Sequence, residues 1–99
     1  MKAFVGIGRY RLDLGSCSSL KDKRHFMRSI IDRLGNSRII GAAEIGELDA
    51  WKSGGVAIAC VSSSRSKVAE ALEGARRTIE GSGVEVLLAE SWVLDPEDL

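Results

Sequence analysis

The chain has 99 residues, of which 44% are hydrophobic and 28% are charged, and its 14 Lys and Arg balance its 14 Asp and Glu. These values are typical of one soluble globular domain whose core is large enough to fold without disulfides or bound metal. No segment approaches the roughly 18 to 20 apolar residues of a membrane-spanning helix. A signal peptide is not expected either, because Arg9, Arg11 and Asp13 interrupt the apolar start. We therefore expect a cytoplasmic protein.

The first elements in chain order are a strand and a helix. Residues 2–14 predict the strand, because they are rich in Phe, Val, Ile and Tyr and end at the loop GSCSS. Ser18 or Ser19 can cap the helix, and with Ser19 as the cap, Asp22 stands where a capping box has its acid. Gly35 ends the helix. The apolar residues that share one helix face are Leu20, Met27, Ile30, Ile31 and Leu34.

The rest of the chain predicts two strands, a helix and a last strand. Residues 38–48 form a less regular strand in which two glycines favour a bend. Residues 56–62 form a short apolar strand that is typical of the middle of a sheet. Ser64 or Ser66 caps the second helix, which two glycines end, and residues 84–94 form the last strand.

The order strand, helix, strand, strand, helix, strand predicts an α+β fold of the ferredoxin-like type. In this βαββαβ sandwich, two helices cover one face of a four-stranded antiparallel sheet, and each crossover is right-handed. We expect residues 1–94 to form this domain and residues 95–99 to form an acidic C-terminal tail.

Several blocks of the chain resemble the YlxP-like family of small bacterial proteins, a domain of unknown function (number 503). They are SLKDKRHFMRSIIDRL, AAEI, Trp51, GVAIACVSSSR and GVEVLLAESWVL, and the resemblance runs from Met1 to Leu94. The resemblance implies a ferredoxin-like fold but no activity. Family members are often encoded beside translation-initiation and ribosome-maturation factors, which hints at a ribosomal role. Before Trp51 the chain departs from the family pattern, with GELDA in place of a more polar loop and Lys52 where Gln is common, so the role of this hairpin stays open.

Charge is distributed unevenly along the chain. Residues 1–38 contain nine Lys and Arg against three acids, whereas residues 39–99 contain five against eleven. Cations crowd the start of the first helix, where the helix dipole disfavours them and where a bound phosphate would reverse the cost. They are either solvated or paired with carboxylates such as Glu44 and Glu90, or they bind an RNA backbone on a ribosomal particle. The candidate anion- or RNA-binding residues are Lys21, Lys23, Arg24, Arg28, Arg9 and Arg11.

The uncovered face of the predicted sheet is the other candidate surface. If Val56, Ile58 and Cys60 face the helices, small residues lie at the centre of the open face. Such a flat, apolar surface suits a second copy or another protein better than it suits base stacking. A single bulge would invert the assignment. The candidate dimer or partner face consists of Phe4, Gly6, Gly8, Ala57, Ala59, Leu87 and Trp92.

Residues suited to catalysis or metal binding are few. The only histidine, His25, is expected at the surface, and Cys17 and Cys60 lie far apart, so a zinc site of the usual type lacks ligands. The serines at 62–64 lack the glycines of a nucleophile elbow. We therefore expect no catalytic residue, cofactor or metal. The favoured function is a non-catalytic accessory factor that binds RNA or a ribosomal particle, and the alternative is a homodimeric protein-interaction module.

Overall fold

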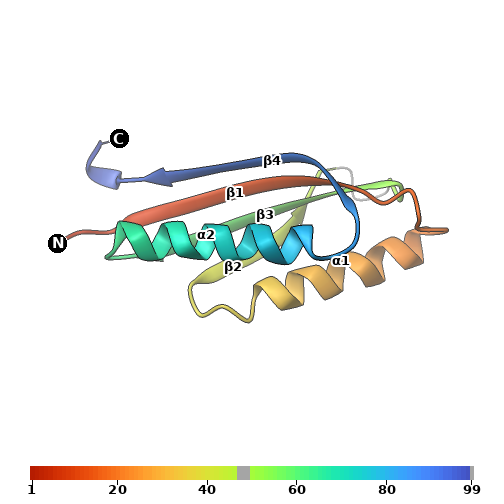
Figure 1. The fold of residues 1–99 in the computed structure, drawn as a ribbon, viewed down its shortest axis with the longest axis horizontal. Coiled ribbons are helices and arrows are strands. Elements are labelled where there is room, and N and C mark those ends of the chain that lie inside the picture. The colour runs from red at the N-terminus through yellow and green to blue at the C-terminus, as the bar shows by residue number, and fades with distance from the viewer. Residues whose placement is uncertain (47–49, 99) are drawn as a thin grey trace.

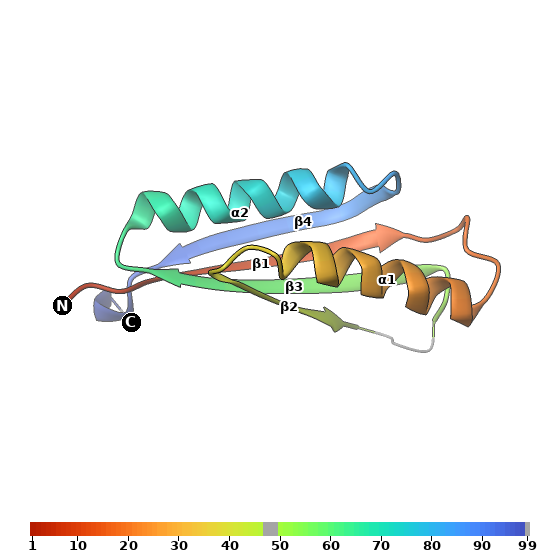
Figure 2. The same cartoon turned by 90° about the horizontal axis from the view of Figure 1, so that it is seen from below.

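The computed structural model contains the predicted order of strands and helices, and it describes residues 1–46 and 50–98. The four strands form one antiparallel sheet in the order β2-β3-β1-β4. Both helices lie on the same side of this sheet (Figures 1 and 2), which is the ferredoxin-like α+β arrangement. The elements are β1 (Phe4–Asp13), α1 (Leu20–Leu34), β2 (Ile40–Ile45), β3 (Ser53–Ser62), α2 (Arg65–Glu80), β4 (Glu85–Leu94) and a 3-10 turn, η1 (Pro96–Asp98).

The hairpin between β2 and β3 differs from the prediction in its boundaries. β2 ends at Ile45, before Gly46 takes a left-handed φ of 90°. β3 begins at Ser53, three residues earlier than predicted, because β1 continues to Asp13 and pairs with Ser53 there. The predicted strand residues 47 and 48 lie outside the described residues. The result is a β1–β3 ladder of ten pairs at the centre of the sheet.

The two helices begin and end as their sequences indicate. Ser19 Oγ accepts a hydrogen bond from Asp22 N at 3.1 Å, and Ser64 Oγ accepts one from Lys67 N at 3.4 Å. These bonds satisfy backbone donors that lack a partner inside the helix. Glycines follow the last turn of both helices. No helix in the described part of the chain is long and apolar enough to cross a membrane.

The core fills the space between the helices and one face of the sheet. A glycine brings α2 close to β1, since a Cβ added to Gly6 would lie 2.6 Å from Val68 Cγ1 and 2.7 Å from Cys60 Sγ. Burial also raises the pKa of the Cys60 thiol, which therefore stays neutral. The buried hydrophobic side chains are Tyr10, Leu12, Leu14, Met27, Ile30, Leu34, Val56, Ile58, Cys60, Val68, Leu72, Ala75 and Ile79.

The two ends of the chain lie at the same end of the molecule (Figures 1 and 2). Lys2 Nζ lies 2.9 Å from Glu97 Oε2 and 3.5 Å from Asp95 Oδ2. These carboxylates raise the pKa of Lys2, and the hydrogen bond from Glu97 N lowers the pKa of Asp95. The acidic tail is thus held next to the start of β1.

We predict that Gly6→Ala destabilises the protein while Gly41→Ala does not. The new methyl group at Gly6 forces Val68 or Cys60 to move, and overpacking of this kind costs about 1–3 kcal/mol. Gly41 is a matched control on the open face of β2, because nothing lies within 4 Å of an added Cβ there. Urea unfolding of both variants measures the difference. Equal midpoints for the two variants would show that α2 does not depend on this close approach.

Candidate functional site

The six cations predicted to bind an anion do not form one site. Lys21, Arg24 and Arg28 are exposed on one flank of α1, and none of them forms an ion pair with a carboxylate of the described residues. Arg9 and Arg11 project from β1 onto the sheet face that the helices leave open. The helix layer and the sheet therefore separate these two groups.

Lys23 is buried, and the prediction that it binds an anion from solvent is wrong. Its side chain is 1% exposed, its ammonium lies 3.5 Å from Glu44 Oε2, and it donates a hydrogen bond to the carbonyl oxygen of Ala50. The cause is its direction around the helix axis, because Lys23 projects between the directions of Met27 and Ile30, which both face the core. Lys23 therefore joins α1 to β2 and to the segment that leads into β3.

Arg9 is paired within the sheet. Its Nη2 lies 2.8 Å and its Nε 3.2 Å from Glu90 Oε2 on β4, and its guanidinium lies 5.2 Å from the centroid of the Trp92 ring. Glu44 and Glu90 were predicted as possible partners of these cations, and each forms an ion pair with one of them: Glu90 with Arg9 and Glu44 with Lys23. Arg9 is thus held by a carboxylate and an aromatic ring.

The start of α1 already contains a negative charge. The carboxylate of Asp22 accepts hydrogen bonds from Ser18 N at 3.1 Å and from the Ser18 hydroxyl. These bonds lower the pKa of Asp22, so the group is ionised near neutral pH. An acid in the first turn offsets the cost of the neighbouring cations. A phosphate is therefore not required to stabilise this helix start.

The predicted face assignment is wrong for β1 and correct for β3. Gly6 pairs with Cys60 and Gly8 pairs with Ile58, and both partners point into the core. Residues paired across antiparallel strands point to the same face, so both glycines face the helices. Phe4 lies on the same side of β1 and packs at the edge of the core. The Arg65 guanidinium lies over its ring, 4.8 Å from the ring centroid.

The face that the helices leave uncovered, here called the open face, collects the exposed hydrophobic side chains. Ala57 and Ala59 lie on it as predicted, and so do Leu87 and Trp92. Sequence reasoning missed three further members, Ile45, Val61 and Leu88. Among the described residues, every large hydrophobic side chain that is at least 36% exposed lies on this face, with the exception of Met1. The place of Ile45 and Leu88 on this face depends on strand pairing, which no local sequence signal reveals: Ile45 pairs with Gly55, and a β-bulge next to the Arg11–Leu88 pair leaves Leu87 as the extra residue.

The open face has a low half and a tall half. The low half, on β2 and β3, bears mostly Gly and Ala, whereas the tall half, on β1 and β4, bears long or aromatic side chains. A hollow of about 550 Å³ lies between them near one end. The residues of the low half are Gly41, Ala43, Ile45, Gly55, Ala57, Ala59 and Val61, and those of the tall half are Val5, Ile7, Arg9, Arg11, Leu87, Leu88, Glu90 and Trp92.

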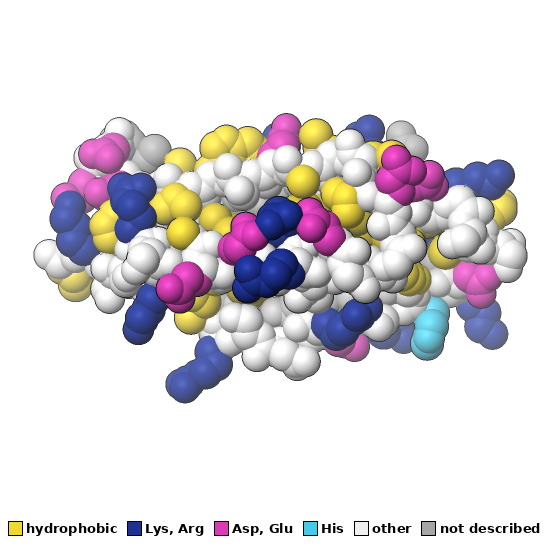
Figure 3. Space-filling view, in the orientation of Figure 1, with side chains coloured by type: hydrophobic (Ala, Val, Ile, Leu, Met, Phe, Trp, Pro, Cys, Tyr) yellow, Lys and Arg dark blue, Asp and Glu magenta, His cyan; other side chains and the backbone are white. Residues whose placement is uncertain are grey.

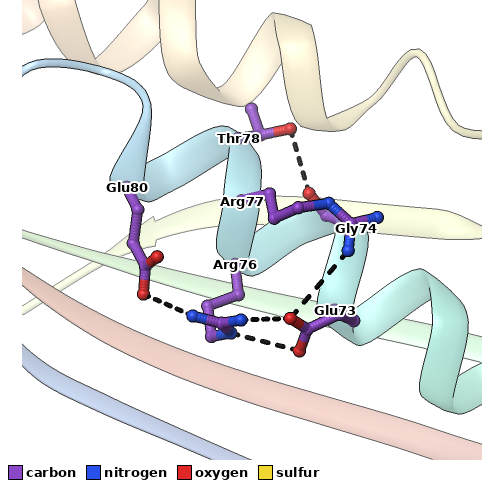
Figure 4. A network of polar contacts seen from close by, with 6 residues as sticks. All are labelled: Glu73, Gly74, Arg76, Arg77, Thr78 and Glu80. Atoms are coloured by element: carbon purple, nitrogen blue, oxygen red, sulfur yellow. Dashed lines mark hydrogen bonds and ion pairs between the residues drawn. The ribbon is translucent and has the colours of Figure 1, made fainter.

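The outer surface of α2 is different, because its charges neutralise one another. Arg76 contacts Glu73 on one side and Glu80 on the other, with Nη1 2.7 Å from Glu80 Oε1, and Arg77 lies 3.9 Å from Glu73 (Figure 4). Basic and acidic side chains are interspersed on this view of the molecule (Figure 3). The α2 surface therefore lacks the single sign of charge that attracts a polyanion.

A second groove, of about 500 Å³, lies between α2 and the end of α1. Its walls include Leu34, Ile40 and Ala75, and Arg33 and Lys67 stand at its rim with Glu70.

The residues considered for catalysis lie at the surface or cap a helix: His25 is exposed on α1, and Ser64 caps α2. Within residues 1–46 and 50–98, no three His, Cys, Asp or Glu side chains are grouped as metal ligands.

Comparison with known proteins shows the family. Residues 5–91 match the model of the family described as "Protein of unknown function (DUF503)", and the chain belongs to this family. It is 32% identical to "Uncharacterized protein YlxP" of Bacillus subtilis (strain 168) over 69 residues, which are 70% of this chain and 75% of that protein. The predicted resemblance to YlxP-like proteins is confirmed.

Two solved structures share the fold at low sequence identity. The de novo designed protein Foldit4 superposes with a TM-score of 0.55 at 13% identity, over 93% of this chain and 96% of that one. The protein YJCS, solved in structural genomics, gives a TM-score of 0.54 at 6% identity, over 89% and 96% of the two chains. At such identities the likeness concerns the fold alone.

We predict that Lys23 and Glu44 are energetically coupled. Lys23→Met keeps the length of the side chain but removes the ammonium, and it leaves the Ala50 carbonyl and the Glu44 carboxylate without this partner, at a cost of about 1–3 kcal/mol. Unfolding of Lys23→Met, Glu44→Gln and the double variant gives the interaction energy, which we expect at about 0.5–3 kcal/mol. Additive effects of the two substitutions would show that the pair does not stabilise the fold.

Proposed function

We propose that this protein is a non-catalytic interaction module that binds a protein surface through the open face of its sheet. The observation that carries the proposal is the gathering of exposed hydrophobic side chains on one face. Val61, Leu87, Leu88 and Trp92 are 55%, 52%, 41% and 41% exposed, and all four belong to the open face. Large apolar side chains gathered on one face in this way are costly to expose to water and mark an interaction site.

The composition of the open face supports a protein partner more than a nucleic acid. A nucleic-acid interface is strongly basic and gains affinity from unpaired cations that contact phosphates. Here Arg9 is already paired with Glu90, and the remaining surface is largely apolar. An aromatic ring and an arginine among aliphatic side chains are typical of the centre of a protein–protein interface.

We predict that a photoreactive amino acid cross-links to protein from the open face and not from α2. The probe is placed at position 88 in one variant and at position 69 in the control, since Ala69 is exposed on the opposite side of the molecule. Irradiation of living cells followed by electrophoresis should give a discrete product for position 88 only. Its yield should fall when Trp92→Glu is added. Equal products from both positions, or none from position 88, would reject the proposed function.

A second candidate function uses three exposed cations on one flank of α1, Lys21, Arg24 and Arg28. They share a flank of the helix and form no ion pair with the described carboxylates, so they remain available to an RNA backbone.

We predict for this function that the affinity for RNA falls as salt rises, with a slope of log affinity against log salt near one per phosphate contact. Changing all three to Glu should abolish retention, whereas changing Lys67 and Arg77 of α2 should not. Retention that survives the triple change would exclude this surface.

A further inference from the structure

We infer that the protein surface bound by the open face is a second copy of this chain, related by a two-fold axis that runs parallel to the strands. This inference rests on the proposed function and names its partner. Its basis is the division of the open face into a low half and a tall half. A two-fold axis between β1 and β3 lays the tall half of each copy over the low half of the other.

The strand register shows which side chains would meet. In one row across the sheet Trp92, Ile7, Ala59 and Gly41 are neighbours, and in the next row Glu90, Arg9, Ala57 and Ala43. The two-fold axis exchanges β4 with β2 and β1 with β3. The ring of Trp92 then lies over the bare backbone at Gly41 of the second copy.

The other end of the face matches in the same way. Leu88, Arg11, Gly55 and Ile45 form the third row. Exchange of the strands brings Leu88 over Ile45 of the second copy, at the hollow of about 550 Å³ that borders Gly55. In the first two rows protruding side chains therefore meet small residues, in the third row Leu88 meets Ile45 beside the hollow, and at the far end Val5 meets Val61. Such self-complementarity is the requirement for an isologous interface.

The size of the face is close to what a stable dimer needs. Three strands of ten residues extend about 33 Å at about 3.3 Å per residue, the six-residue β2 extends about 20 Å, and four strands about 4.8 Å apart cover roughly 19 Å. Their flat footprint is roughly 600 Å², and protruding side chains add accessible area to it. Standard interfaces bury about 800 Å² on each partner.

Charge on the face also suits a second copy. Arg9 and Glu90 neutralise each other within one chain, so two copies can meet without a central repulsion. The alanines that would lie opposite them have no polar group that needs a partner. Arg11 lies toward the end of the face, where its side chain can extend to water at the edge of the interface.

Sedimentation velocity over a series of concentrations tests whether the copies associate. The purified chain should shift from monomer to dimer as its concentration rises. Gly41→Arg should abolish the shift, because it fills the low half at a position where the monomer has space for a side chain. Gly41→Ala and Ala69→Arg are the controls that should still dimerise. Circular dichroism of each variant verifies that the monomer is folded.

Cross-linking tests the direction of the two-fold axis. Chains with Glu90→Cys are mixed with chains with Ala43→Cys, all in a Cys17→Ser background, and treated with a bismaleimide that spans the roughly 10 Å between packed sheets. These two positions lie on opposite edges of one sheet but meet in the inferred dimer. A covalent pair of unlike chains is expected. A product between two Glu90→Cys chains would instead indicate an axis perpendicular to the strands and would overturn the inferred geometry.

The failure of this inference can be told from the failure of the proposed function. A chain that stays monomeric at every concentration, while position 88 cross-links in cells to a different protein, overturns the second copy and leaves the interaction module. A monomeric chain with no cross-link from position 88 rejects both.

Discussion

The structure depends on the packing of both helices against the same face of the sheet. Gly6 allows α2 to approach β1 so closely that a methyl group would collide with Val68 and Cys60. On the other side, Met27 of α1 lies against the backbone of Gly54 in β3. The helices thereby bury the even-numbered residues of the two central strands, and the odd-numbered residues remain on an uncovered face. A sheet covered on one side only is stable in water when its open face is polar, yet here that face bears Trp92, Leu87 and Leu88.

The cations near the start of the chain illustrate how tertiary structure divides one sequence feature among several roles. Lys23 is buried and joins α1 to β2 through Glu44. Arg9 is part of the open face, where Glu90 and the Trp92 ring hold it. Lys21, Arg24 and Arg28 on the flank of α1, and Arg11 on the open face, are exposed and form no ion pair with a described carboxylate. Among the described residues, three of the nine cations of residues 1–38, Lys2, Arg9 and Lys23, form ion pairs with carboxylates of the second half, so part of the uneven charge along the chain is used in contacts between its two halves.

Much of the fold could be predicted because it depends on local patterns. The serine caps and terminal glycines of both helices, the apolar stripe of α1 and the order of strands and helices along the chain all follow from short stretches of sequence. The candidate site was predicted less completely. The sequence of β1 does not indicate which of its faces is buried, because Gly6 and Gly8 carry no side chain. The bulge at Leu87 and Leu88, and the early start of β3 at Ser53, come from pairing with β1 and have no signal of their own.

The sequence by itself determined the α+β class, the order of the elements and the ends of the helices, because propensities, caps and periodicity act over a few residues. It also determined that apolar residues would be left over after the core was filled. Only the tertiary structure decided where those residues would meet. Ile45, Val61, Leu88 and Trp92 come from three strands, and pairing register brings them to one face. The pairing of β1 with β3 and β4 joins segments that are distant in the chain, so no local pattern of the sequence specifies its register.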